Sequence, residues 1–276
     1  MKSDHKMKPT VGIIGAGRMG APIIGHLVRK GFATQACDLN PDKQTLVTGH
    51  GALWAAGPAE LAAACDVILV CVGFDAEVRA LFAEGGPLRA ARPGSIVAIL
   101  STIHPDTVKA LAAQAEPLGV HVVDSTVCRG GEAADKGTLL SFVGGSAEVV
   151  ARLDPVLRAY STDVVHTGGV GTAQVAKAAN NLILWACLVA DHEALALAQH
   201  YGADIESLRK ALLISSCTNG PLETWGKQTM AWADDDLAIV SGMAAEAGIA
   251  LPQAGLNREI CRTLKPIRYK LENYGR

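Results

Sequence analysis

The sequence has few aromatic residues and no marked excess of either charge. Phenylalanine, tryptophan and tyrosine make up 4% of the 276 residues, and 25 lysines and arginines nearly balance 27 aspartates and glutamates, for a net charge of −2. A chain this close to neutrality creates no field that attracts a polyanion, so a nucleic-acid partner is not expected. The abundant alanine, glycine and valine are typical of helices that pack closely on a parallel sheet.

Paired cysteines, metal-ligand motifs and long apolar runs are also absent. The seven cysteines are odd in number and form no CxxC pair, which predicts mostly buried free thiols and a reducing compartment, the cytoplasm. We find no apolar run long enough to span a bilayer and no signal peptide, and the polar residues 1–9 predict a disordered lead-in. His192-Glu193 is followed by Ala196 where a zinc-binding HExxH motif needs histidine, so no metal is expected.

The first glycine-rich segment has the pattern of a dinucleotide-binding turn. A β-prone run at residues 10–14 leads into Gly-Ala-Gly-Arg-Met-Gly at residues 15–20, and a helical segment follows. The first glycine of such a turn permits the bend, the second lets the backbone approach a pyrophosphate, and the third lets the helix pack on the strand. We therefore predict the following cofactor-binding residues here: Gly15, Gly17, Arg18, Met19 and Gly20.

Asp38 is the residue expected to select the cofactor. It ends a second predicted strand at residues 33–37, close to the spacing of about 20 residues that is usual for this acid. Its carboxylate can accept hydrogen bonds from a ribose 2′-OH and would repel a 2′-phosphate. No arginine follows it, so NAD is predicted in preference to NADP.

Strand and helix patterns alternate through the first half of the chain and then stop. Five further strands are predicted at residues 66–72, 95–100, 120–123, 139–143 and 164–165, and four helices at residues 172–201, 204–214, 234–247 and 256–274. We expect an α/β Rossmann-type domain with a mostly parallel, doubly wound sheet at residues 10–167, followed by an all-α substrate and oligomerisation domain at residues 168–276. Ligands of such a sheet collect at the carboxyl ends of its strands, where Val72, residues 101–102 and residues 128–131 lie.

A second glycine-rich segment opens the helical half. Lys177 and Asn181 are four residues apart and share one helix face, and the unbroken apolar run at residues 182–190 is typical of a buried helix. An isolated pair of this kind is more often structural, with a lysine that reaches the surface and an asparagine that caps a neighbouring element.

Four blocks together resemble the β-hydroxyacid dehydrogenases, the family that contains 3-hydroxyisobutyrate dehydrogenase, tartronate semialdehyde reductase and relatives of 6-phosphogluconate dehydrogenase. They are residues 11–22, the loop at residues 124–131, the segment at residues 168–181 and the triplet at residues 235–237. The resemblance extends from Val11 to about Pro252. It implies reversible, NAD(P)-dependent hydride transfer between a small, anionic 3-hydroxy acid and its semialdehyde, in a homodimer or homotetramer.

The resemblance also implies roles for particular residues. Lys177 matches the catalytic general acid/base, and Asn181 matches the companion that holds the substrate and the lysine in register. Ser101 and Thr102 would lie near the nicotinamide ribose, so we predict Ser101 as a substrate contact and Thr102, with Val72, as cofactor contacts. The loop that contacts the substrate carboxylate is represented by Cys128, Arg129 and Gly130.

Two segments depart from the family pattern, the substrate loop and the triplet at residues 235–237. The substrate loop usually reads Asp-Ala-Pro-Val-Ser-Gly-Gly, whereas this chain has Cys128 for the serine and Arg129 for the first glycine. The guanidinium either reads a carboxylate, sulfonate or phosphate of the substrate, or turns outward to an acid such as Glu132. Asp235 stands where the family usually places a lysine close to the cofactor.

Two other functions share the glycine turn. Imine reductases have the same fold but generally lack the catalytic lysine, which argues against that class. A non-catalytic NAD-binding sensor would need neither Lys177 nor Asn181.

Overall fold

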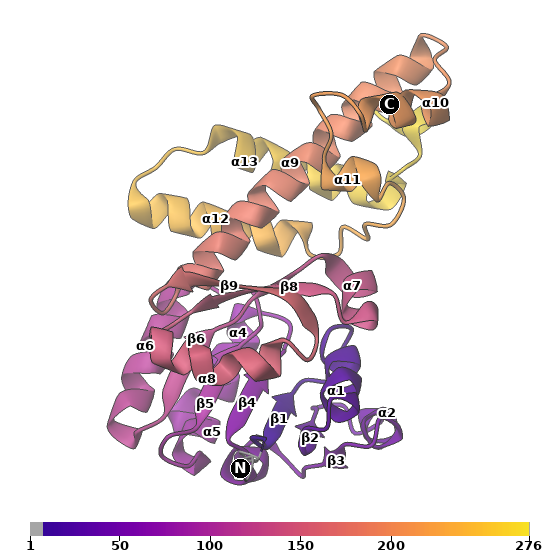
Figure 1. Ribbon diagram of the computed structural model, residues 1–276. Coiled ribbons are helices and arrows are strands. Elements are labelled where there is room, and N and C mark those ends of the chain that lie inside the picture. Colours follow the sequence, from indigo (N-terminus) through magenta and orange to yellow (C-terminus); the bar gives the residue numbers. More distant parts are fainter. Residues whose placement is uncertain (1–7, 276) are drawn as a thin grey trace, which may run out of the picture. The chain divides into compact units, whose positions relative to one another are not determined.

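The computed structural model describes residues 8–275 and separates into two compact units (Figure 1). The first unit ends at Lys177 and the second begins at Ala178. The lead-in predicted at residues 1–9 falls, apart from Lys8 and Pro9, outside the described residues.

One sheet forms the centre of the first unit. Within the described residues its strand order is β3-β2-β1-β4-β5-β6-β8-β7, with β9 paired to β8. The strands are β1 (Val11–Ile14), β2 (Thr34–Cys37), β3 (Leu53–Trp54), β4 (Val67–Val70), β5 (Ile96–Ile99), β6 (His121–Asp124), β7 (Val127–Cys128), β8 (Leu139–Gly144) and β9 (Ser161–Gly168). The first six are parallel, β8 runs antiparallel to β6 and β7, and β9 is parallel to β8. This is the predicted mostly parallel Rossmann sheet, whereas β3 and β7 have two residues each and were missed because no periodicity can develop over that length.

Helices cover both faces of this sheet. They are α1 (Gly20–Arg29), α2 (Lys43–Gly49), α3 (Pro58–Ala64), α4 (Asp75–Leu81), α5 (Gly86–Ala90), α6 (Pro105–Ala115), α7 (Gly130–Lys136) and α8 (Ala147–Leu157), with 3-10 turns η1 (Ala83–Gly85) and η2 (Glu116–Leu118). Ile13 packs into the apolar cluster that contains Leu27 of α1 and Leu153 of α8, whereas its neighbour Ile14 packs into the cluster that contains Leu111 of α6. Successive strand side chains therefore fill two cores, which explains the continuous apolar runs in the sequence.

The second unit is helical. It contains most of α9 (Thr172–His200), followed by α10 (Ile205–Leu212), α11 (Gly220–Glu223), α12 (Ala233–Ala247), α13 (Pro252–Leu264) and the 3-10 turns η3 (Lys265–Ile267) and η4 (Leu271–Asn273). The helix predicted at residues 256–274 is wrong at both ends. Proline favours the first turn of a helix, so α13 starts at Pro252, and Pro266 cannot continue it past Leu264.

Helix α9 has the length and composition of a membrane span. It has 29 residues and a mean hydropathy of 1.4 over its most apolar window, so the prediction that no segment was long enough is corrected. The core helix of a soluble protein has the same features. Trp185, Leu188 and Val189 of α9 are buried in the core of the second unit, which accounts for part of its apolar surface.

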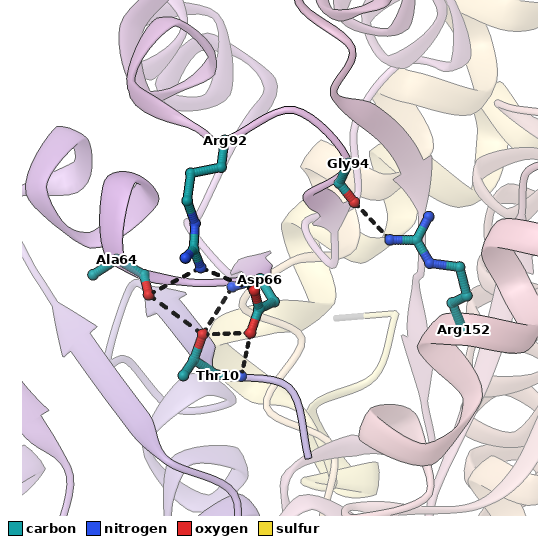
Figure 2. A network of polar contacts seen from close by, with 6 residues as sticks. All are labelled: Thr10, Ala64, Asp66, Arg92, Gly94 and Arg152. Carbon is teal, nitrogen blue, oxygen red and sulfur yellow. Dashed lines mark hydrogen bonds and ion pairs between the residues drawn. The ribbon is translucent and has the colours of Figure 1, made fainter. Parts of the chain in front are cut away.

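A polar network fastens the amino ends of the parallel strands (Figure 2). The backbone N–H and the hydroxyl of Thr10 both donate to Oδ2 of Asp66 at 2.8 Å, and Nη2 of Arg92 donates to Oδ1 of Asp66 at 2.9 Å. Burial of Asp66 is outweighed by these donors, which hold the pKa of its carboxyl below its usual range. Arg152 donates to the Gly94 carbonyl oxygen nearby at 2.6 Å. This network lies at the opposite edge of the sheet from the glycine turn, so we assign it a structural role.

Candidate active site

In the turn between β1 and α1, two of the three glycines pack closely against backbone atoms and the third faces open space. Gly15 has a φ of +102°, and a Cβ there would collide with the Cys71 carbonyl oxygen. A Cβ on Gly20 would collide with the carbonyl oxygen of Gly15. A Cβ on Gly17 would meet nothing within 4 Å, so its backbone faces open space at the start of α1. A helix start with an open glycine backbone fits a pyrophosphate group.

A cavity of about 350 Å³ adjoins this turn. Its lining includes Gly17 and Arg18 from the turn, Lys43 and His50 from the α2 region, and Asp135 of α7. Arg18 makes a two-point ion pair with Asp135, with Nη1–Oδ1 at 2.7 Å and Nη2–Oδ2 at 2.6 Å. The ion pair joins the glycine turn to the helix that follows the predicted substrate loop.

Asp38 lies at the carboxyl end of β2 and faces the turn. Its Oδ2 accepts a hydrogen bond from the Ala16 backbone N–H at 2.7 Å, and its Oδ1 accepts one from the Asn40 N–H at 2.8 Å. Each carboxylate oxygen can accept a second hydrogen bond, so both can still bind a ribose hydroxyl. The turn and this acid together fit a dinucleotide cofactor.

Ser101 joins the ends of β4 and β5. Its hydroxyl accepts from the Val72 backbone N–H at 3.0 Å and donates to the Val72 carbonyl oxygen at 2.8 Å. Ser101 is buried and Thr102 is half-buried. The structure thus brings Val72, Ser101 and Thr102 to one edge of the sheet, while their contacts with cofactor and substrate stay predictions.

Asp124 anchors the start of α9. Its side chain is fully buried at the end of β6, where Oδ1 accepts from the Gly171 N–H at 2.7 Å and Oδ2 accepts from the Gln174 N–H at 2.9 Å. A Cβ on Gly144 of β8 would collide with this carboxylate, so glycine is needed beside it. Burial raises the pKa of Asp124, although the backbone N–H donors oppose the shift. Thr126 forms a second link to the first turn of α9, because its hydroxyl donates to the Ala173 carbonyl oxygen at 3.0 Å.

This anchoring sets Lys177 against the predicted substrate loop. Its Nζ donates to the Val127 carbonyl oxygen at 2.8 Å and lies 3.7 Å from Sγ of Cys128. Val127 and Lys177 are 50 residues apart in sequence, and the fold of the first unit brings them into contact. Asn181 follows on the same helix, in the second unit, where it is buried and its Oδ1 accepts from Nδ2 of Asn180 at 3.0 Å.

Arg129 has a strained backbone and an acidic partner. Its φ is +84°, in the left-handed region where glycine is favoured and other residues are uncommon. Nη1 donates to Asp163 Oδ2 at 2.7 Å, to Thr162 Oγ1 at 2.9 Å and to the Thr138 carbonyl oxygen at 3.1 Å. Glu132 pairs with Lys136 instead, at 2.6 Å. The acid that Arg129 contacts therefore lies on β9, and Gly130, with a φ of +73°, begins α7 beside it.

The cysteines and Asp235 are the remaining residues that the sequence singled out. The seven cysteines, all within residues 8–275, form no disulfide, and burial raises the thiol pKa of Cys37 and Cys71 to about 12, so these two thiols are protonated at neutral pH. Asp235 is exposed in the first turn of α12 in the second unit.

Two buried residues of the site, Asp124 and Gln174, had no role assigned from sequence. Asp124 ends a predicted strand and Gln174 lies one turn before Lys177, and those positions were the available signals.

Comparisons with known proteins agree with this arrangement. Residues 10–169 match the NAD-binding domain of 6-phosphogluconate dehydrogenase, and residues 171–270 match the NAD-binding region of NADP-dependent 3-hydroxyisobutyrate dehydrogenase. An uncharacterised oxidoreductase of Mycobacterium tuberculosis is 30% identical over 91% of this chain and 92% of its own length. The mitochondrial 3-hydroxyisobutyrate dehydrogenase of Bos taurus is 33% identical over 76% of this chain, which spans only 62% of the bovine protein.

Solved structures show the same two-part architecture. A 3-hydroxyisobutyrate dehydrogenase of Mycobacterium tuberculosis with L-serine has a TM-score of 0.86 and 26% identity, covering 94% of both chains. An imine reductase of Myxococcus stipitatus with NAD+ has a TM-score of 0.69 at 19% identity, covering 95% of both chains, which is a likeness of fold alone.

Proposed function

Because the chain belongs to the β-hydroxyacid dehydrogenase family, a family of NAD(P)-binding oxidoreductases, we propose that it interconverts a small 3-hydroxy acid and its semialdehyde, with NAD as cofactor. The observation that carries this proposal is the position of Lys177. Its amino group contacts the Val127 carbonyl oxygen and lies beside Cys128. Both residues belong to the loop that corresponds to the substrate loop of the family. A sensor that only bound the dinucleotide would need no amino group at this place.

In the proposed reaction Lys177 moves the proton. It accepts the hydroxyl proton when the alcohol is oxidised and returns it to the carbonyl oxygen in the reverse direction. A dinucleotide whose pyrophosphate is held at the glycine turn would supply or accept the hydride through its nicotinamide. The Val127 carbonyl oxygen holds the amino group in place, and Asn181, one helical turn further on, would bind the substrate and keep it in register with Lys177.

The test is oxidation of NADH, with NADPH in parallel, across a panel of short aldehyde acids. The panel comprises the semialdehydes of methylmalonate, tartronate and succinate, together with glyoxylate and a sulfonated aldehyde. We expect strong turnover of at least one member with NADH preferred. Tight NADH binding with no turnover of any member would contradict the proposal and favour an imine substrate or a sensor.

Replacing Asp38 with alanine should reduce the preference for NADH over NADPH by about tenfold or more. Hydrogen bonds to a charged group are worth about 1.5–3 kcal/mol, and a 2′-phosphate would no longer meet a carboxylate. The measurement is kcat/KM with each cofactor. Asp42→Ala is the matched control, since Asp42 is an exposed acid just before α2. An unchanged preference in the Asp38 variant would contradict the assignment of NAD selectivity to this residue.

Replacing Arg129 with alanine should lower kcat/KM by about 10- to 100-fold on substrates with an anionic group, with little change on neutral alcohols of the same length. A lost charge-assisted contact accounts for a reduction of this size. Binding an anion would require the guanidinium to share or leave Asp163, so Asp163→Asn should strengthen the response to anionic substrates. Arg262→Ala, which breaks exposed pairs with Asp234 and Glu259 in the second unit, is the control. An equal loss on both substrate classes would rule out anion recognition by Arg129.

Three further proposals concern the whole protein. The division near residue 167 separates a cofactor domain from a helical domain that serves substrate binding and self-association. The protein would act as a homodimer or homotetramer in the cytoplasm, a reducing compartment that suits seven cysteines without a disulfide. Analytical ultracentrifugation of the purified chain measures the oligomeric state directly.

A further inference from the structure

We propose that Gln174 is a positioning residue that fixes the distance between Lys177 and the cofactor-facing loop at residues 101–103. The inference rests on the proposed function and extends it to a residue that does not itself touch the reacting atoms. Gln174 is 1% exposed and lies in the first turn of α9, three residues before Lys177.

The carboxamide of Gln174 pairs with the loop as a peptide group of a neighbouring strand would. Its Oε1 accepts from the Ile103 backbone N–H at 2.9 Å, and its Nε2 donates to the Ser101 carbonyl oxygen at 2.8 Å. These two backbone groups lie on either side of Thr102. One side chain therefore holds the backbone on both sides of the residue that we predict to contact the cofactor.

The same residue is fixed from the side of the helix. The Gln174 N–H donates to the buried carboxylate of Asp124, which also binds the Gly171 N–H. Lys177 lies one turn further along, with its amino group on the Val127 carbonyl oxygen. A rigid turn of helix thus connects the amino group that moves the proton to the Gln174 amide.

The chain of contacts continues from the loop to the end of β4. Ser101, whose carbonyl oxygen binds Gln174, also exchanges two hydrogen bonds with Val72 through its hydroxyl. A displacement at Gln174 would therefore shift Ser101, Thr102 and Val72 together relative to Lys177. Errors of about 1 Å in such a geometry can cost about 100-fold in rate.

Two substitutions of Gln174 distinguish the effect of its hydrogen bonds from the effect of its side-chain volume. Gln174→Met has a similar length but neither donor nor acceptor, so it leaves the Ser101 carbonyl oxygen and the Ile103 N–H without this partner. Gln174→Glu keeps the shape of the side chain. In its protonated form the carboxyl can still donate to the Ser101 carbonyl oxygen and accept from the Ile103 N–H. Burial raises the pKa of an introduced carboxyl, so this protonated form is favoured as the pH falls.

The first experiment is kinetic and uses the full-length variants with the best substrate of the panel. Gln174→Met should lower kcat about 10- to 100-fold while the KM for NADH changes less than threefold. Gln174→Glu should regain most of the wild-type kcat at low pH and lose it as the pH rises, whereas Gln174→Met shows no such recovery. Gln114→Met and Gln114→Glu are matched controls, because Gln114 is exposed on α6 of the same unit. Equal kcat for wild type and Gln174→Met, or a Gln174→Glu deficit independent of pH, would overturn the proposal.

The second experiment needs no turnover and so separates this inference from the proposed function. Hydrogen exchange measured by mass spectrometry should be faster in Gln174→Met both for peptides that cover residues 101–103 and for those that cover residues 171–177, with the Gln114 variants unchanged. Unchanged exchange in the 101–103 peptides would overturn the inference even if the wild type is an active dehydrogenase. A wild type that is inactive across the panel refutes the proposed function, and the exchange result then decides the coupling alone. If Gln174→Met does not fold, Gln174→Glu supplies the comparison: its exchange relative to wild type at the same pH should be faster at high pH and close to wild type at low pH.

Discussion

Lys177→Ala is expected to lower kcat by about 10²–10⁴-fold while the dissociation constant for NADH changes little. A positioned general acid/base contributes a factor of this size, and the glycine turn that we propose to bind the dinucleotide is built from other residues of the first unit. The amino group lies 2.8 Å from the Val127 carbonyl oxygen, so its removal deletes one hydrogen bond from a half-buried position. The measurement is steady-state kinetics together with NADH titration by fluorescence.

Lys177→Arg distinguishes proton transfer from simple charge. Arginine retains the positive charge on a slightly longer side chain, but it is not deprotonated in proteins. We expect this variant to be nearly as inactive as Lys177→Ala. Substantial activity in Lys177→Arg would mean that the site needs a cation and no proton donor, and joint loss of activity and NADH binding in both variants would indicate a structural role. Lys210→Ala, at an exposed ion pair on α10, is the control.

Asp124→Ala is expected to lower the free energy of unfolding by about 3 kcal/mol. The carboxylate is fully buried and caps α9 through the N–H groups of Gly171 and Gln174, so its removal leaves two buried donors without a partner, at about 1–3 kcal/mol each. Urea unfolding measures the change. Asp204→Ala is the matched control, because Asp204 caps α10 from an exposed position by accepting from the Ser207 N–H, and such a loss costs about 1 kcal/mol. Similar losses for the two variants would contradict the special role of the buried cap.

The effect of Asp124→Ala should also depend on pH. Burial raises the pKa of Asp124 above the value of about 3.9 expected in the unfolded chain, so the folded state binds the proton more tightly. The contribution of this ionisation to stability is complete below about pH 4 and is lost as the pH rises through the folded-state pKa. The difference in free energy of unfolding between wild type and Asp124→Ala should therefore be larger near pH 4 than at a pH above the folded-state pKa of Asp124. A difference that grows with rising pH would show that the N–H donors outweigh burial.

The sequence by itself determined the fold class and the order of its parts. The continuous apolar runs, the glycine turn at residues 15–20 and the change to helical periodicity after Gly171 are local patterns, and local patterns follow from steric and hydrophobic preferences over a few residues. The same reasoning put Lys177 and Asn181 on one helix face. It failed for the two-residue strands β3 and β7 and for the ends of α13, where the pattern was too short or a proline set the boundary. The division placed between residues 167 and 168 stays a prediction.

Only the tertiary structure decided which groups meet in the site. Arg129 pairs with Asp163, although Glu132 is far closer in sequence, because β9 lies beside β8 and brings that acid to the loop. Asp124 and Gln174 gained their roles in the same way, since their partners come from separate strands and the start of α9. Such contacts join segments tens of residues apart, and each depends on the sheet order and on how the chain closes around it. No local propensity in the sequence encodes these contacts, so the fold class could be inferred from the sequence while the partners of its polar side chains could not.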